Sequence, residues 1–220
     1  MRFLALCALA IFGGCGTPAP DAGRLLTIGD SVMAWNGDRG IPEVAATTRG
    51  LPLVDASRSG SRVVQDNGVL SALGLDIAGQ WAANRGRWAA VAMTGGGNDL
   101  RGTCGTADVD SARDALIGPG LDGAIPALVA DMLAAGSPVV YVGYYDANPE
   151  VTTGFSACQP AFDVMNARMA ALADRTRGLT FLDAGTVIDP ADGSLLAADA
   201  VHPSPRGSQL IGAALASVLP

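Results

Sequence analysis

Three side chains in this sequence have the types and the spacing that nucleophilic catalysis requires. His202 is the only histidine, and Asp199 precedes it by three residues. Ser31 lies far from both, in TIGDSVMAW, directly after an apolar run. A serine hydroxyl becomes an effective nucleophile when a histidine removes its proton and a carboxylate orients that histidine. Each residue also has a simpler reading, because Ser31, Asp30 and Asp199 are of the types that cap helices.

The ionisable side chains exclude several other chemistries. All 14 basic residues are arginine, so the chain has no lysine for a Schiff base, a pyridoxal-phosphate anchor or a P-loop. One histidine cannot build a zinc site of two or three histidines, nor a dinuclear phosphoesterase centre. The formal net charge of −7 disfavours binding to nucleic acid, whose phosphates carry the same sign of charge. We therefore expect chemistry without a metal or a cofactor.

The first residues are typical of an exported protein. Arg2 precedes an apolar run over 3–12, and two glycines then lead to Cys15. The run is too short to span a bilayer but suits the core of a signal peptide, which we place at 1–14. The small-small-Cys ending resembles the lipobox of bacterial lipoproteins, which implies a lipidated Cys15 and a flexible tether over 15–23. The alternative is a plain secretory signal with an incidental cysteine.

Cysteine usage agrees with export to the cell envelope or periplasm. Cys7 lies in the signal and Cys15 is the lipidation candidate, which leaves Cys104 and Cys158. In an oxidising compartment two such cysteines pair more often than they stay free. We expect a disulfide between them, with two separate buried thiols as the alternative.

The remaining chain, 24–220, is predicted to form one α/β domain. Five apolar runs bounded by Gly, Pro or Asp indicate strands at 25–29, 51–57, 88–95, 138–145 and 179–184. Helical spacing of apolar residues marks 121–136, 160–178 and a last helix, for which Ser204 is the expected N-cap and Pro205 the first residue. Alternating strands and helices predict a parallel sheet covered on both faces, a three-layer α/β/α fold. Right-handed crossovers favour the flavodoxin-like strand order 2-1-3-4-5.

This strand order predicts where a site would form. Sites in open α/β sheets lie beyond the carboxyl ends of the strands where the order reverses, here between the first and third strands. The segments that leave the first three strands are GDS (29–31), SRSGS (57–61) and GGGND (95–99). Glycine at position 60 and at 95–97 would let the backbone approach a substrate and adopt positive φ. A phosphate-cradling loop is disfavoured, because GGG lacks the G-x-G-x-x-G spacing.

Four short blocks, in order along the chain, resemble the GDSL/SGNH hydrolase family of serine esterases and lipases. G-D-S at 29–31 matches the nucleophile block, and Gly60 matches the glycine of the second block. G-G-N-D at 96–99 matches the G-x-N-D block, and Asp199 with His202 matches the D-x-x-H block. The resemblance covers 29–202 and implies the SGNH hydrolase fold.

The resemblance also implies an acyl-enzyme mechanism. Ser31 would be the nucleophile, His202 the general base and Asp199 the carboxylate that orients the imidazole. The oxyanion hole would comprise the N–H groups of Ser31 and Gly60 and the side-chain amide of Asn98.

Other side chains near these turns are expected to support the site. Asp30 and Asp99 are interpreted as carboxylates that cap or brace the two glycine-rich turns. Four aromatic residues follow the carboxyl ends of strands and would either line an acyl or alcohol pocket or pack in the core and rim: Trp35, Tyr144, Tyr145 and Phe155.

The sequence therefore predicts an exported, monomeric serine esterase. The expected substrate is a small-molecule or glycan ester, such as a small acyl ester, a thioester, a lysophospholipid or a carbohydrate O-acetyl group. The membrane would be reached only through the lipid anchor. The alternative is a non-catalytic envelope lipoprotein that keeps the fold for binding, although such a protein has no need of His and Asp at this spacing.

Overall fold

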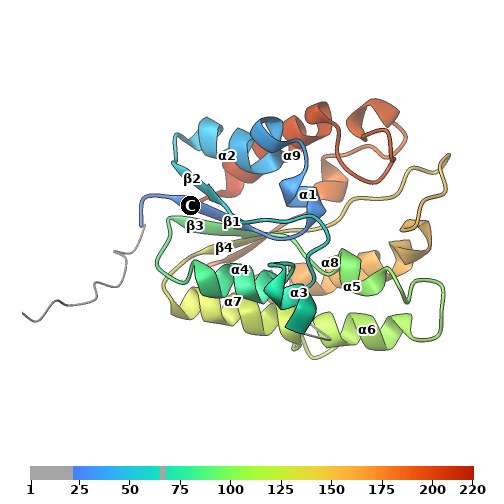
Figure 1. Cartoon of the computed structure of the whole chain (residues 1–220), viewed down its shortest axis with the longest axis horizontal. Coiled ribbons are helices and arrows are strands. Elements are labelled where there is room, and N and C mark those ends of the chain that lie inside the picture. Colours follow the sequence, from blue (N-terminus) through green and yellow to red (C-terminus); the bar gives the residue numbers. More distant parts are fainter. Residues whose placement is uncertain (1–21, 65–67) are drawn as a thin grey trace, which may run out of the picture.

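The fold is built around a five-stranded parallel sheet (Figure 1). A computed structural model describes residues 22–64 and 68–220. The strands are β1 (Leu25–Ile28), β2 (Leu53–Asp55), β3 (Ala90–Met93), β4 (Val139–Val142) and β5 (Leu179–Leu182). All neighbours pair in parallel, in the order β2-β1-β3-β4-β5. The predicted α/β class and strand order are confirmed, and each strand lies within its predicted apolar run.

The three central strands are buried along their whole length. Every residue of β1, β3 and β4 is buried, whereas the edge strands β2 and β5 are partly exposed. A parallel sheet covered on both faces produces such continuous apolar runs in the sequence, in place of an alternating pattern. The sheet is therefore the centre of the hydrophobic core.

Helices cover both faces of the sheet (Figure 1). One face carries α1 (Ser31–Ala34), η1 (Gly37–Arg39), α2 (Ile41–Arg49) and α9 (Pro205–Val218). The other carries α3 (Gly68–Ala72), α4 (Ile77–Ala83), α5 (Gly97–Leu100), α6 (Val109–Leu116), α7 (Ala124–Ala134) and α8 (Gln159–Ala173). The short 3-10 turns η2 (Ser156–Cys158), η3 (Ala184–Thr186) and η4 (Gly193–Leu195) lie in connecting segments.

The ends of the predicted helices follow local signals. The Ser204 hydroxyl accepts a hydrogen bond from the Gly207 N–H at 3.1 Å, so Ser204 caps α9 as predicted. Gly136, with φ +83°, follows the end of α7. Helix α8 is shorter than expected and ends at Ala173, because turns precede Gly178, whose φ of +86° leads the chain into β5.

Helices α2 and α9, from opposite ends of the domain, pack side by side on one face of the sheet (Figure 1). A Cβ atom on Gly212 would lie 2.6 Å from the Cβ of Val44, so only glycine permits this approach. The contact brings the segment after α1 close to the segment before α9, and these two segments carry site residues.

Within the described residues, no helix is long and apolar enough to cross a membrane. The predicted signal over 1–14 and the lipidation candidate Cys15 lie outside the described part of the chain.

Candidate active site

The turn after β1 presents Ser31 at the start of helix α1. Gly29 has φ +142°, and a Cβ atom there would lie 2.6 Å from the Thr94 carbonyl oxygen, so the turn requires glycine. Asp30 is the N-cap, since its carboxylate accepts a hydrogen bond from the Val32 N–H at 3.0 Å. Ser31 is therefore not the cap, and its side chain lines a cavity beyond the strand ends.

The Asp30 carboxylate is buried and also accepts a hydrogen bond from the Tyr144 hydroxyl. The same hydroxyl accepts a hydrogen bond from the Gly97 N–H at 2.8 Å. Burial raises the pKa of Asp30, against the opposing effects of the Tyr144 and Val32 hydrogen bonds and of the His202 charge. Asp30 thus ties the turn after β1 to the segment that follows β4 and, through Tyr144, to α5, as the bracing interpretation predicted.

Asp199 contacts His202 along one edge of the imidazole. The Asp199 Oδ2 atom lies 2.6 Å from His202 Nδ1, and its Oδ1 atom accepts hydrogen bonds from the Val201 and His202 N–H groups, each at 3.0 Å. Partial burial opposes ionisation of Asp199, but the hydrogen bonds from His202 and Val201 and the His202 charge together lower its pKa. The carboxylate therefore both shapes the loop and orients the ring.

Asn98 and Asp99 connect α5 to the segment that follows β2. The Asn98 side-chain amide donates to the Ser61 carbonyl at 3.0 Å. The Asp99 carboxylate accepts from the Val63 and Val64 N–H groups at 3.1 and 2.8 Å, so it braces this segment as predicted. Burial raises the pKa of Asp99, although those two N–H groups and the Arg62 charge oppose the effect.

Gln80 in α4 is a buried bridge that sequence reasoning missed. Its Oε1 atom accepts from the Gly29 N–H at 2.7 Å, and its Nε2 atom donates to the Gly29 carbonyl at 3.1 Å. The Nε2 atom also donates to the Ser61 hydroxyl at 2.9 Å. One side chain therefore joins the turn that carries Ser31 to the segment that carries Gly60. The one feature of the sequence that could have indicated this bridge is a glutamine within an otherwise apolar helix.

Gly60 occupies an exposed turn, closed by a hydrogen bond from the Ser61 N–H to the Arg58 carbonyl at 3.2 Å. Its φ of +85° matches the predicted need for glycine. Within 95–97 only Gly96 has positive φ, at +110°, so that expectation was wrong for two of the three glycines. Those two are needed for space, because a Cβ atom on Gly95 or Gly97 would press against the side chains beside it.

The cavity has a volume of about 50 Å³ and brings Ser31, Asn98 and His202 together. Gly60 is not among its lining residues, and neither is Trp35. The Ser31 hydroxyl and the imidazole line the cavity without a hydrogen bond between them in the described chain, and catalytic hydrogen bonds often close only when substrate binds. Much of the wall is aromatic, formed by Tyr144, Tyr145, Phe155 and Phe162.

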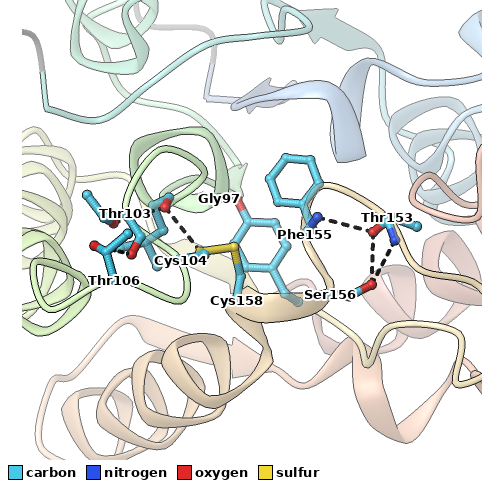
Figure 2. Close-up of a disulfide and its surroundings, with 10 residues drawn as sticks. Gly97, Thr103, Cys104, Thr106, Thr153, Phe155, Ser156 and Cys158 are labelled. Atoms are coloured by element: carbon cyan, nitrogen blue, oxygen red, sulfur yellow. Dashed lines mark hydrogen bonds between the residues drawn. A yellow bond between two sulfur atoms is a disulfide. The ribbon is translucent and has the colours of Figure 1, made fainter.

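A disulfide joins the two loops beside this wall. Cys104 and Cys158 are bonded, with their Cα atoms 4.8 Å apart. Figure 2 shows the bond, with Thr153, Phe155 and Ser156 on the segment that leads to Cys158. The Arg101 guanidinium lies 5.5 Å from the centre of the Phe155 ring and forms a second link between the loops. Asn98 and Phe155 are therefore carried by covalently connected segments.

The described residues contain no group of three or more His, Cys, Asp and Glu side chains that could hold a metal ion. Three of the residues that line the cavity, Ser31, His202 and Asn98, carry a hydroxyl, an imidazole and an amide, which are the groups of nucleophilic acyl transfer.

Comparison with known proteins gives the family. Residues 27–210 match the model of the GDSL-like Lipase/Acylhydrolase family, so the chain belongs to that family. It is an esterase/lipase-type hydrolase. The comparison with curated proteins finds no match.

Solved structures share the fold. A protein from Slackia heliotrinireducens assigned to the SGNH hydrolases is 25% identical, with TM-score 0.58 and coverage of 91% of this chain and 100% of that one. A carbohydrate acetylesterase from Sinorhizobium meliloti is 16% identical, with TM-score 0.64 and coverage of 88% and 97%. A member of the lipolytic G-D-S-L family from Veillonella parvula is 16% identical, with TM-score 0.60 and coverage of 89% and 97%.

Proposed function

We propose that this protein hydrolyses carboxylic esters through an acyl-enzyme on Ser31. The observation that carries the proposal is that Ser31, Asn98 and His202 line one cavity while Asp199 contacts the far edge of the imidazole. A carboxylate at Nδ1 favours the tautomer with its proton on that nitrogen. The other ring nitrogen, Nε2, is then free to accept the proton of the Ser31 hydroxyl.

The reaction has two half-reactions. In the first, Ser31 Oγ attacks the ester carbonyl as its proton passes to His202, and the imidazolium then protonates the departing alcohol. In the second, a water molecule gives a proton to His202 and attacks the acyl carbonyl. The acyl–Oγ bond then breaks as the imidazolium returns its proton to Ser31 Oγ, which releases the acid and restores the free enzyme. Asp199 stabilises the imidazolium in both halves.

The oxyanion of each tetrahedral intermediate requires fixed hydrogen-bond donors. We assign this role to the Asn98 amide and the N–H groups of Ser31 and Gly60. Asn98 is supported by its place in the cavity wall and by the Ser61 carbonyl, which holds one of its two amide hydrogens. Gly60 is supported by the resemblance and by Gln80, which ties the neighbouring Ser61 to the Ser31 turn.

The cavity favours a short acyl group. Its volume of about 50 Å³ compares with about 10–15 Å³ for one water molecule, so it holds a group of a few heavy atoms. The aromatic wall suits an acetyl or similar acyl group better than a charged one. Acetate esters, small thioesters and carbohydrate O-acetyl groups fit this description, and the long chain of a lysophospholipid would extend beyond the cavity.

The test is hydrolysis of p-nitrophenyl acetate by wild type, Ser31→Ala and His202→Ala. Both variants are expected to lose activity while their thermal unfolding stays within a few degrees of wild type, since the two residues act as one unit. A chelator is expected to have no effect. Substantial activity in either variant would overturn the mechanism, and an inactive wild type that binds glycan or lipid would favour the binding-protein alternative.

We further propose that the protein is exported to the cell envelope as a monomer and is held there through a lipid on Cys15. The support is the order of basic residue, short apolar run, small residues and cysteine, followed by a Pro/Gly/Ala-rich tether. The acidic domain would have little membrane affinity of its own.

A further inference from the structure

The indole of Trp35 stacks on the imidazole of His202. The two ring centres are 3.8 Å apart and the ring planes differ by 9°, which is face-to-face contact. Trp35 directly follows α1, the short helix that begins at Ser31. One helix therefore presents Ser31 at its first residue and ends in the ring that covers one face of His202.

Asn36, which follows Trp35, is hydrogen-bonded to the chain directly after His202. Asn36 has a left-handed backbone, with φ +70°. Its side-chain amide donates to the Pro203 carbonyl and to the Ser208 hydroxyl, both at 2.8 Å. Trp35 therefore stacks on His202, and Asn36, the next residue, is hydrogen-bonded to Pro203, the residue after His202. We call Trp35 and Asn36 the α1 clamp.

Other contacts hold the remaining sides of the His202 segment. Asp199 contacts the Nδ1 edge, and the Tyr145 hydroxyl donates to the Val201 carbonyl at 2.7 Å. Asp199 and Asp30 are the carboxylates whose ionisation the His202 charge favours, and the Tyr145 phenol lies on the same side of the site, on the segment that follows β4. Among these contacts, the α1 clamp is the one made by the residues that directly follow the Ser31 helix.

Trp35 differs from the other two tryptophans. Trp81 and Trp88 are almost fully buried, and their indole N–H groups donate to Asp131 and to the Asn84 carbonyl, as expected of core residues. Trp35 is only half-buried and is not a cavity-lining residue, so neither core filling nor direct substrate contact accounts for its position.

We propose that Trp35 is a positioning residue for the general base, an inference that rests on the proposed esterase function. The indole face attracts a cation, and tryptophan is the aromatic residue that does so best. His202 becomes a cation in both half-reactions, between accepting a proton and returning it. The stack therefore holds the imidazole ring toward Ser31 and stabilises its protonated form. The protonated form occurs in the transition state and not in the enzyme–substrate complex, so this stabilisation lowers the barrier without strengthening substrate binding.

The first test compares Trp35→Leu, Trp35→Phe and wild type with p-nitrophenyl acetate. Trp35→Leu keeps apolar bulk but removes the aromatic face, so kcat should fall roughly 3- to 30-fold with little change in KM. Trp35→Phe should recover most of the loss, because a phenyl face remains. Wild-type kcat in Trp35→Leu would overturn the inference, and so would an equal loss in Trp35→Phe and Trp35→Leu.

The second test measures tryptophan fluorescence of the wild type as a function of pH. It needs no substrate and does not depend on whether Trp35→Leu folds. A protonated imidazole in contact with an indole quenches its fluorescence more than a neutral one does. Emission of the wild type should therefore rise as His202 loses its proton, and this transition should be absent from His202→Gln and from Trp35→Phe. A transition that persists in His202→Gln would show that another group causes it and would overturn the inference.

These results separate the inference from the function on which it rests. A wild type without esterase activity would refute the proposed function and the inference together. An active wild type whose kcat is unchanged by Trp35→Leu would refute the inference alone.

Discussion

The side-chain amide of Asn98 donates a hydrogen bond to the backbone carbonyl of Ser61, at 3.0 Å. An asparagine amide has two hydrogens, so this bond uses one and fixes the direction of the other. Asn98 lines the same cavity as Ser31, so in the proposed mechanism the second hydrogen is the preorganised donor beside the nucleophile. In that mechanism the bond to Ser61 would remove the reorganisation that a free side chain undergoes during the reaction.

Asn98→Ala should lower kcat by about 10²- to 10³-fold, the typical loss for one oxyanion donor, while KM changes little. Steady-state kinetics with p-nitrophenyl acetate measure both constants. The matched control is Asp99→Ala, which releases Val63 and Val64 from the same bracing position but keeps Asn98. If Asp99→Ala loses as much kcat as Asn98→Ala, then Asn98 acts by holding the segment and not as a donor.

The Tyr144 hydroxyl, on the segment that follows β4, donates a hydrogen bond to the buried Asp30 carboxylate and accepts one from the Gly97 N–H, so Tyr144→Phe should destabilise the fold. The substitution leaves an acceptor on Asp30 and the Gly97 N–H without this partner, at a cost of about 1–3 kcal/mol near neutral pH. Urea unfolding measures the loss. The control is Tyr145→Phe, which removes a hydroxyl donor to the uncharged Val201 carbonyl.

The loss in Tyr144→Phe should depend on pH. Burial raises the pKa of folded Asp30 above that of the unfolded chain, so the folded state keeps a proton that the unfolded state releases. The unfolding free energy therefore falls as the pH rises through that interval. The Tyr144 hydrogen bond lowers the pKa of folded Asp30, so Tyr144→Phe should raise that pKa further and widen the pH range over which stability falls. The loss of unfolding free energy relative to wild type should therefore be larger at about pH 7 than at about pH 4. A deficit independent of pH, like that expected for Tyr145→Phe, would contradict this account of Asp30.

The elements that the sequence predicts best are those whose signal is local. The runs around β1, β3 and β4 are apolar because both faces of these strands are covered, and the Ser204 cap is decided within a few residues. Short blocks such as G-D-S are also local, which is why the sequence alone picks out Ser31 and Asn98 as candidates, and both line the cavity.

The supporting polar contacts are not local. Gln80 contacts Gly29 across 51 residues, Tyr144 contacts Asp30 across 114, and Asn36 contacts Pro203 across 167. A polar side chain has a specific partner only after the strands and helices have packed, so its residue type does not reveal the partner. Trp35 is a similar case, because the sequence places it near the site but does not distinguish a cavity wall from a stack on His202.

The proposed lipid anchor on Cys15 predicts where the full-length protein is found. Expressed in a Gram-negative host, the wild type should fractionate with membranes, and Cys15→Ser should not become lipidated. A chain that begins at Arg24 should be soluble, because it lacks the signal, the cysteine and the tether. Membrane fractionation with mass spectrometry of Cys15 measures this outcome. If the wild type is instead free in the periplasm with an unmodified Cys15, the segment is a plain secretory signal and the lipid anchor is refuted.

The disulfide should affect both stability and acyl-chain selectivity. Cys104 and Cys158 close a loop with a sequence separation of 54, so Cys104→Ala/Cys158→Ala should lose about 2–4 kcal/mol of unfolding free energy. The same change frees the segment that carries Phe155, a wall residue of the small cavity (Figure 2). Activity on hexanoate relative to acetate esters should therefore rise.

The comparison for this double variant is Arg101→Ala, which removes the guanidinium from the Phe155 ring but keeps the covalent link. An exposed cation–π contact contributes about 0.5–1 kcal/mol, so Arg101→Ala should change stability and selectivity much less than loss of the disulfide. Folded wild type produced under oxidising conditions from Arg24 onward should titrate no free thiol. Unchanged chain-length selectivity in the double variant would show that the disulfide supports the fold alone and that the Phe155 wall is held by its own packing on Phe162, whose ring centre lies 6.4 Å away.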